Sequence, residues 1–204
     1  MNIENILSVA PVMPMLVIHK LEQAVPLAQA LVAGGFEVLE VTLRTPVSLD
    51  AVDAIAKALP DTLVGVGTLT RPEQFVQAAD VGARFAVSPG LTHVLLSASA
   101  ETEMAYLPGI FTPSEAMAAR ELGFDHLKFF PAKQAGGIGM LKTLAGPFPD
   151  LKFSPTGGVN AKNFRDYLAL PNVECVGGTW IAPEEAIMAG DWDGITRRAK
   201  EALS

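Results

Sequence analysis

The sequence predicts a single α/β domain over residues 1–204, folded as a (β/α)8 TIM barrel. Three observations lead to this fold class. Eight short runs typical of strands alternate with eight longer stretches typical of helices. The phrases "LVAGGFEVLEV", "AADVGARFAVS" and "ARELGFDHLKF" repeat one unit, in which a helix ends, a glycine follows and a strand begins. No linker or low-complexity segment divides the chain.

The strand-like runs are short, apolar and spaced along the whole chain. In order they are Val12–Ile18, Glu37–Leu43, Thr62–Gly67, Arg84–Ser88, Met104–Pro108, His126–Phe130, Leu151–Ser154 and Val173–Gly177. Strands that alternate with helices are expected to pair in parallel through right-handed crossovers.

The helix-like stretches fill the intervals, and several begin with N-terminal signals. They lie near Leu21–Ala33, Val47–Leu59, Pro72–Ala79, Thr92–Ser99, Pro113–Leu122, Ile138–Leu144, Ala161–Leu168 and Glu184–Ala189, with one more at Asp191–Leu203. Thr112 before Pro113, with Glu115 three residues after the threonine, is typical of a helix start. Thr92 before an apolar run is another.

A doubly wound open sheet is the alternative fold. That fold usually carries a phosphate-binding fingerprint after its first strand, and the sequence has neither G-x-G-x-x-G there nor G-x-x-x-x-G-K-[ST] anywhere. The barrel is therefore preferred, and its chemistry is expected at the C-terminal ends of the strands.

Composition limits the function classes. The formal net charge is −7 and no run of Lys or Arg stands out, so nucleic acid and anionic membranes are not expected as partners. The single cysteine, Cys175, cannot form an internal disulfide and lies in an apolar run, where a buried thiol is expected rather than a nucleophile. The N-terminus lacks a signal-peptide pattern and no apolar run is long enough for a membrane span, which predicts a soluble, cytoplasmic protein.

Polar residues interrupt two of the predicted strands. In "VLEVTLRT", alternation places Glu40, Thr42 and Arg44 on one side, with Glu40 directed into the barrel and Arg44 at the upper rim. The same alternation in "DHLKFFPAK" directs Lys128 inward. Burial disfavours the charged form of an amine, and a neutral amine can form a Schiff base with a carbonyl group. A buried Lys–Glu pair without chemistry remains the alternative, and Lys133 is expected to be solvated on the rim.

Glycines with small polar residues follow most of the other strands. At the ends of these strands stand Gly67-Thr68, Ser88-Pro89-Gly90, Thr156-Gly157-Gly158 and Gly177-Gly178-Thr179. Such turns after the seventh and eighth strands of a barrel are typical of a phosphate site, because bare backbone N–H groups can approach the anion. His19, His93 and His126 are scattered without metal-ligand spacing, so no metal site is predicted.

The blocks "LEVTLRT", "KFFPA" and "PTGGV", in this order, closely resemble the bacterial 2-dehydro-3-deoxy-phosphogluconate (KDPG) aldolases, a family that includes 4-hydroxy-2-oxoglutarate (KHG) aldolases. The similarity extends from "PVMPMLVI" to "VGGTW". The resemblance implies a class I aldolase on a (β/α)8 barrel, commonly a homotrimer, that uses neither a metal nor a cofactor. It would cleave KDPG to pyruvate and glyceraldehyde 3-phosphate, and 4-hydroxy-2-oxoglutarate to pyruvate and glyoxylate.

The resemblance also implies roles for individual residues. Lys128 matches the Schiff-base lysine and Glu40 the general acid/base. The substrate-binding positions are Arg44 and Thr68 for the pyruvyl carboxylate, Pro89 at its strand end, Thr156 beside the aldehyde part, and Gly157, Gly158, Gly178 and Thr179 on the phosphate side.

Two positions depart from the common family pattern. Many members have serine where this chain has Thr179. Many also have "PAE" where this chain has "PAK", which ends in Lys133.

Two other functions are left open by the residues alone. A related barrel could isomerise or epimerise a sugar phosphate, with Glu40 as base and Lys128 as an electrostatic helper. A non-catalytic barrel could serve as an oligomeric scaffold, although a scaffold needs no inward lysine and glutamate. The preferred substrate among KDPG, its galacto epimer and 4-hydroxy-2-oxoglutarate is likewise undecided.

Overall fold

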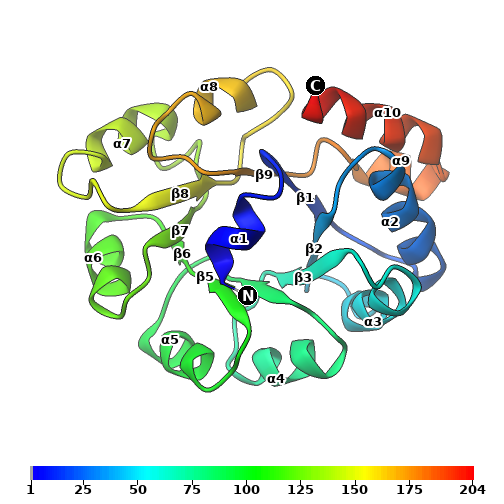
Figure 1. The fold of residues 1–204 in the computed structure, drawn as a ribbon, viewed down its shortest axis with the longest axis horizontal. Helices are drawn as coiled ribbons and strands as arrows, with labels where there is room; N and C mark the ends of the chain where they lie inside the picture. The colour runs from blue at the N-terminus through cyan, green and yellow to red at the C-terminus, as the bar shows by residue number, and fades with distance from the viewer. Residues whose placement is uncertain (1) are drawn as a thin grey trace.

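The structure, a computed structural model, describes residues 2–204 as curled parallel sheets surrounded by helices (Figure 1). The strands are β1 Val12–Leu16, β2 Val38–Thr42, β3 Leu63–Gly67, β4 Phe85–Val87, β5 Ala105–Leu107, β6 Gly109–Ile110, β7 His126–Phe129, β8 Lys152–Pro155 and β9 Val176–Gly178. The helices are α1 Ile3–Leu7, the 3-10 turn η1 Leu21–Gln23, α2 Ala24–Ala33, α3 Ser48–Ala58, α4 Glu73–Asp80, α5 His93–Ala100, α6 Pro113–Glu121, α7 Gly137–Leu144, α8 Phe164–Leu168, α9 Glu184–Ala189 and α10 Trp192–Leu203.

All pairings between named strands are parallel. Six strands form one sheet in the order β5-β4-β3-β2-β1-β9, and three form a second sheet in the order β6-β7-β8. The first strand of the chain therefore lies between β2 and β9, the last strand. Isolated parallel bridges join Phe153 to Val173 and Thr156 to Gly177, at the edge between β8 and β9. The α/β class and the parallel pairing are confirmed, whereas closure into a full barrel stays a prediction.

Pro108 separates β5 from β6 at the end of the predicted strand Met104–Pro108. A proline has no N–H to donate to a ladder, so regular pairing stops there. Before Pro108 the chain pairs with β4, and after it the chain pairs with β7. Gly109 permits this change of partner, because a side chain there would overlap the backbone of Ser88 and Pro89. The predicted strand Met104–Pro108 thus contains β5, whereas the two-residue strand β6 was not predicted.

Helix caps explain several boundaries. Thr112 and Glu115 form the expected capping box at α6, in which each side chain accepts from the other residue's backbone N–H. Thr92 caps α5, and Asp191 caps α10 by accepting from the Gly194 N–H at 3.0 Å. Asn2 caps α1, a short helix that the sequence analysis did not predict.

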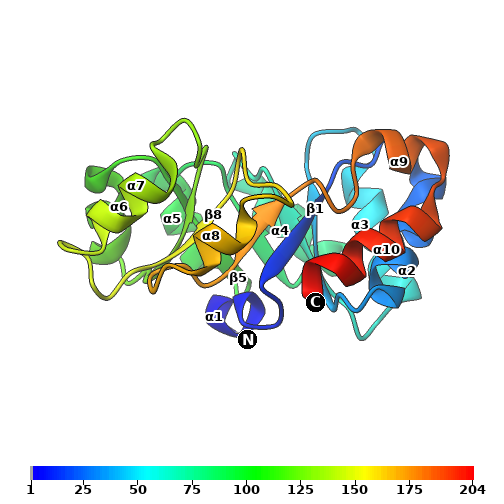
Figure 2. The same cartoon turned by 90° about the horizontal axis from the view of Figure 1, so that it is seen from above.

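The site lies at the end of the strands opposite α1. Helix α1 precedes β1 and lies at the end from which β1 starts (Figure 2). Since the strands are parallel, the loops that follow them gather at the other end. Between residues 2 and 204, no helix is both long and apolar enough to cross a membrane.

Candidate active site

Glu40 and Lys128 meet inside the curled sheets. Both side chains come from fully buried strands, β2 and β7, and each residue is only 3 % exposed. Lys128 Nζ lies 3.6 Å from Glu40 Oε1. This distance permits an ion pair but is longer than a good hydrogen bond, so it leaves the carboxylate able to accept another proton donor. The predicted inward direction of both residues is confirmed by this contact.

The absence of a side chain at Gly67 makes room for the Glu40 carboxylate. A Cβ built on Gly67 would overlap Glu40 Oε1 and lie 2.6 Å from Glu40 Cδ. Among the described residues, Glu40 Oε1 is buried and has no hydrogen-bond partner. A buried carboxylate oxygen that accepts no hydrogen bond is costly for stability alone, which is typical of a group that binds a ligand or a water molecule.

Phe130 forms an apolar wall beside the amine. Lys128 Nζ lies 5.5 Å from the centroid of the Phe130 ring, which comes directly after β7. Ser154, on the neighbouring strand β8, pairs in register with Lys128 and is 2 % exposed. Ser154 was not predicted as a site residue. The parity of "KFSPT", which places Ser154 on the same side as Thr156, is the sequence signal that points to it.

Arg44 and Thr68 meet at the rim. Arg44 follows β2 and is exposed, and its Nε donates to Thr68 Oγ1 at 3.2 Å. Thr68 follows β3 and has φ of 60°. A β-branched residue in the left-handed region is strained, and such strain is concentrated at functional sites. The pair places a guanidinium and a hydroxyl together above the buried Glu40 and Lys128.

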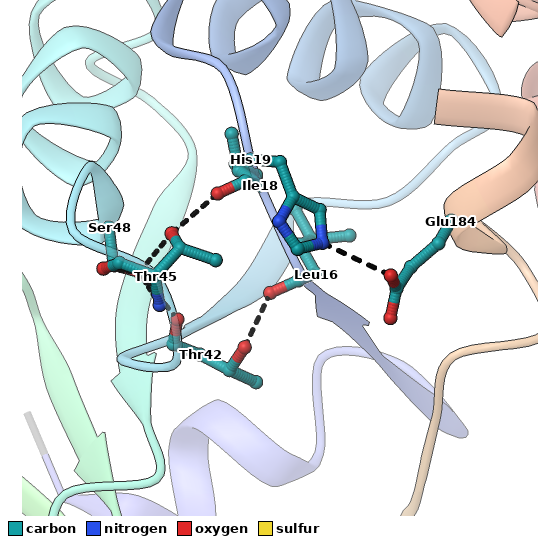
Figure 3. A network of polar contacts seen from close by, with 7 residues as sticks. All are labelled: Leu16, Ile18, His19, Thr42, Thr45, Ser48 and Glu184. Carbon is teal, nitrogen blue, oxygen red and sulfur yellow. Dashed lines mark hydrogen bonds and ion pairs between the residues drawn. The ribbon is translucent and has the colours of Figure 1, made fainter. Parts of the chain in front are cut away.

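A hydrogen-bond network fixes the turn that carries Arg44. Figure 3 shows the side chains of Thr42, Thr45 and Ser48 gathered beside the end of β1. Thr42 Oγ1 donates to Leu16 O at 3.0 Å, and Ser48 Oγ donates to Thr42 O at 2.8 Å. Thr45 Oγ1 donates to Ile18 O. Because these bonds tie the β2–α3 turn to β1, the exposed Arg44 is attached to a rigid base.

The His19–Glu184 pair adds a second tie at the same end of β1. His19 Nε2 lies 3.1 Å from Glu184 Oε2, and in Figure 3 the two side chains approach each other from separate segments. Both side chains are about half exposed, so the pair contributes little to stability on its own.

The two glycine turns present free backbone N–H groups. Gly157 and Gly158 have φ of 95° and 81°, and the Asn163 side-chain amide donates to Gly158 O at 3.0 Å. Among the described residues, the N–H groups of Gly157, Gly158 and Val159 find no acceptor. The N–H groups of Thr179 and Trp180, after β9, are likewise free within residues 2–204. Successive free N–H groups form a concave site for an anion.

Thr156 and Pro89 occupy the ends of their strands. Thr156 follows β8, is 5 % exposed, and its Oγ1 lies against Gly177, where an added side chain would overlap the hydroxyl. Pro89 is half-buried beside Gly109. Each predicted site residue thus lies at or beyond the C-terminal end of a strand, except Glu40 and Lys128, which lie inside.

The environment of Cys175 differs from that of a reactive thiol. Burial, and secondarily the charges of Glu40 and Glu174, raise the pKa of Cys175 to about 12. The thiol is therefore protonated at neutral pH, as expected for a buried rather than a nucleophilic cysteine. Within residues 2–204, no group of three or more His, Cys, Asp or Glu side chains is arranged to hold a metal ion.

Comparison with known proteins gives a consistent result. The family model described as "KDPG and KHG aldolase" matches residues 3–198. The KHG/KDPG aldolase of Escherichia coli K12 is 51 % identical over 200 residues, covering 98 % of this chain and 94 % of that protein.

Two solved structures are similar over nearly the whole chain. KDPG aldolase from Legionella pneumophila, with pyruvate captured as a covalent carbinolamine intermediate, is 50 % identical with a TM-score of 0.99, covering 100 % of this chain and 99 % of that chain. The Zymomonas mobilis ZM4 aldolase with 3-phosphoglycerate is 43 % identical with a TM-score of 0.94, covering 99 % and 95 %.

Proposed function

The chain belongs to the KDPG and KHG aldolase family, and from this premise we propose that it is a class I aldolase acting through a Schiff base on Lys128. It cleaves KDPG to pyruvate and glyceraldehyde 3-phosphate, and 4-hydroxy-2-oxoglutarate to pyruvate and glyoxylate. The observation that carries the proposal is the buried amine of Lys128, 3.6 Å from Glu40 Oε1. A nucleophilic amine beside an acid/base is what imine chemistry requires.

The first half of the reaction forms the electron sink. The neutral amine of Lys128 adds to the C2 ketone and gives a carbinolamine, while Arg44 and Thr68 hold the substrate carboxylate. Loss of water then gives an iminium. This step is supported by the Legionella relative, which holds pyruvate as a carbinolamine. The Phe130 ring, with its centroid 5.5 Å from Lys128 Nζ, lines the apolar side of the place where the ketone would bind.

The second half breaks the carbon–carbon bond. Glu40 takes the proton of the C4 hydroxyl, the C3–C4 bond breaks, and its electron pair passes into the iminium to give an enamine. The aldehyde leaves, and Glu40 returns the proton to C3. Water then hydrolyses the iminium, releasing pyruvate and the free amine, so the water lost earlier is regained. This role is supported by Glu40 Oε1, which is buried and accepts no hydrogen bond among the described residues.

The glycine turns are assigned to the phosphate side of the substrate. The free N–H groups of the turn after β8 support this assignment, as do those of Thr179 and Trp180. Thr156, with its hydroxyl against Gly177, is assigned to the aldehyde part, where it influences the stereochemistry of the hydroxyl-bearing carbon. Pro89, just beyond the end of β4, is assigned to the same substrate-binding site. The Zymomonas relative with 3-phosphoglycerate is consistent with a phosphate-binding end.

We further propose that the two sheets close into one (β/α)8 barrel and that residues 1–204 form a single domain. The bridges between β8 and β9 support closure, as does the Glu174 N–H that donates to Phe153 O at 3.1 Å. A crystal structure should contain a continuous ring of strands; a solvent-filled gap between β8 and β9 would contradict closure.

A homotrimer in the cytoplasm completes the proposal. Helices α4, α5 and α6 follow one another around the fold (Figure 1). They and their loops expose apolar side chains that a partner copy would cover. These residues are Val76, Val94, Phe111 and Met117, each between 44 % and 62 % exposed. Light scattering after size-exclusion chromatography should give the mass of three chains, and a monomer mass would contradict the trimer.

The test of function is pyruvate release, coupled to NADH oxidation by lactate dehydrogenase. KDPG, its galacto epimer and 4-hydroxy-2-oxoglutarate are compared under one set of conditions. We expect pyruvate from KDPG and from 4-hydroxy-2-oxoglutarate, and the ratio of kcat/KM values gives the preference. Conversion of a sugar phosphate without any pyruvate would favour the isomerase alternative.

A further inference from the structure

Lys133 is attached to the glycine turn after β8 by its backbone and by its side chain. Its N–H donates to Gly157 O at 2.9 Å, and the preceding Ala132 N–H donates to Thr156 O at 2.7 Å. The aliphatic stem of Lys133 lies on the face of Gly158. A Cβ built on Gly158 would overlap Lys133 Cβ and lie 3.0 Å from Cδ. Lys133 is therefore not a detached surface residue, because the β7–α7 loop holds it against this turn.

The ammonium of Lys133 has no partner of its own. Among residues 2–204, ion pairs of lysine join Lys57 to Asp53 and Lys128 to Glu40, and none involves Lys133. Lys152 Nζ, by contrast, is satisfied by Pro171 O at 2.7 Å. The chain as a whole carries a formal net charge of −7, so the cation of Lys133 stands out against an acidic background. The lysine that packs on Gly158 thus brings a positive charge to a turn with free N–H groups.

We propose that Lys133 is a specificity-determining residue, whose ammonium binds the substrate's terminal phosphate and favours phosphorylated over unphosphorylated 2-keto acids. The proposal rests on the proposed aldolase function and deepens it. A phosphate on the sixth carbon extends past the aldehyde part to the turn after β8. The shorter dicarboxylic acid, held at Lys128 through its second carbon, ends before that turn. Lys133 therefore contributes binding energy to one substrate and not to the other.

The size of the effect follows from the kind of contact. A hydrogen bond to a charged group contributes more binding free energy than a hydrogen bond between neutral groups. Lys133 is exposed, however, so solvent screens its charge and reduces this contribution. We expect a contribution of about tenfold in kcat/KM. The effect should decrease as ionic strength rises, because the contact is between charges at the surface.

The test compares Lys133→Met with two other variants. Methionine keeps an unbranched side chain that can cover Gly158, and it removes the ammonium group. Lys142→Met is the matched control, because Lys142 is an exposed lysine in the last turn of α7. Lys133→Arg tests rescue by another cation.

For Lys133→Met we expect kcat/KM for KDPG to fall about tenfold, mainly through KM, and kcat/KM for 4-hydroxy-2-oxoglutarate to stay within about twofold. The Arg variant should recover most of the loss, and Lys142→Met should behave as wild type. Equal losses on both substrates would indicate a structural role and overturn the proposal, as would no loss on either.

Direct binding separates this proposal from the proposed function. Calorimetry with inorganic phosphate should give a Kd about tenfold weaker for Lys133→Met than for wild type. An unchanged Kd overturns the role of Lys133 even if the enzyme is an aldolase. A wild type that binds phosphate through Lys133 but releases no pyruvate from any substrate would instead refute the aldolase function alone.

Discussion

Replacing Gly67 with alanine should displace Glu40, the proposed general acid/base, without substituting Glu40 or Lys128. The added Cβ would overlap Glu40 Oε1 and lie 2.6 Å from Glu40 Cδ and 2.8 Å from Cγ. Carbon atoms in contact prefer roughly 3.5 Å or more, so the carboxyl group has to move by about 1 Å. It starts 3.6 Å from Lys128 Nζ. A misplacement of about 1 Å costs about 100-fold in rate, or about 2.7 kcal/mol in the barrier.

The assay for Gly67→Ala is pyruvate release from KDPG at saturating substrate. We expect kcat to fall about 100-fold, while pyruvate is still trapped on Lys128 by borohydride, because the amine itself is unchanged. Urea unfolding shows whether the variant is folded.

Gly139→Ala is the control, since nothing lies within 4 Å of a Cβ at that position in α7. It should keep wild-type activity and gain about 0.5–1 kcal/mol of stability. A folded Gly67→Ala enzyme with wild-type kcat would refute the placement of Glu40 as acid/base.

Four other predictions follow from the same structure. Glu40→Gln should lower kcat by about 10²–10⁴-fold while pyruvate trapping persists, and an unchanged kcat would remove Glu40 from the mechanism. Thr112→Ala breaks the capping box of α6 and should cost about 1 kcal/mol in the free energy of unfolding by urea; a loss near zero would mean that the cap is not stabilising. Burial raises the pKa of Cys175 from 9.0 to about 12. The unfolded chain therefore releases this proton first, and the contribution of Cys175 to stability is present below pH 9 and lost as the pH rises toward 12, by at most about 1.4 kcal/mol per pH unit. Urea unfolding of Cys175→Ala should show a weaker alkaline decline than wild type, and parallel declines would contradict the assignment. Prolonged dialysis against EDTA should leave activity unchanged, whereas a loss restored by a divalent cation would contradict a metal-independent mechanism.

The interior of the site was predictable because strands have a strict two-residue period. The alternation within "VLEVTLRT" and "DHLKFFPAK" was sufficient to predict that the Glu40 and Lys128 side chains face the interior. The 3.6 Å contact between them confirms this prediction. Parallel order then followed from the alternation of strands and helices. The glycine turns were recognisable as turns because tight connections favour glycine.

Features that depend on tertiary contacts were not predictable from pattern. Helix α1 has only five residues, too few to show a helical period. The change of pairing partner at Pro108, from β4 before the proline to β7 after it, depends on which strands lie beside the chain. The positive φ of Thr68 is imposed by its surroundings, since threonine disfavours that region. The contact of Lys133 with Gly158 joins two loops whose approach no local pattern encodes.

The central claim is that Lys128 forms a Schiff base with a 2-keto acid. Wild-type protein is incubated with pyruvate and sodium borohydride, digested, and analysed by mass spectrometry, with Lys128→Met treated in parallel. We expect a reduced pyruvyl group on the peptide containing Lys128, loss of aldolase activity in step with the labelling, and an unlabelled Lys128→Met protein. An unmodified Lys128, or labelling of Lys133 in its place, would contradict Schiff-base formation on Lys128.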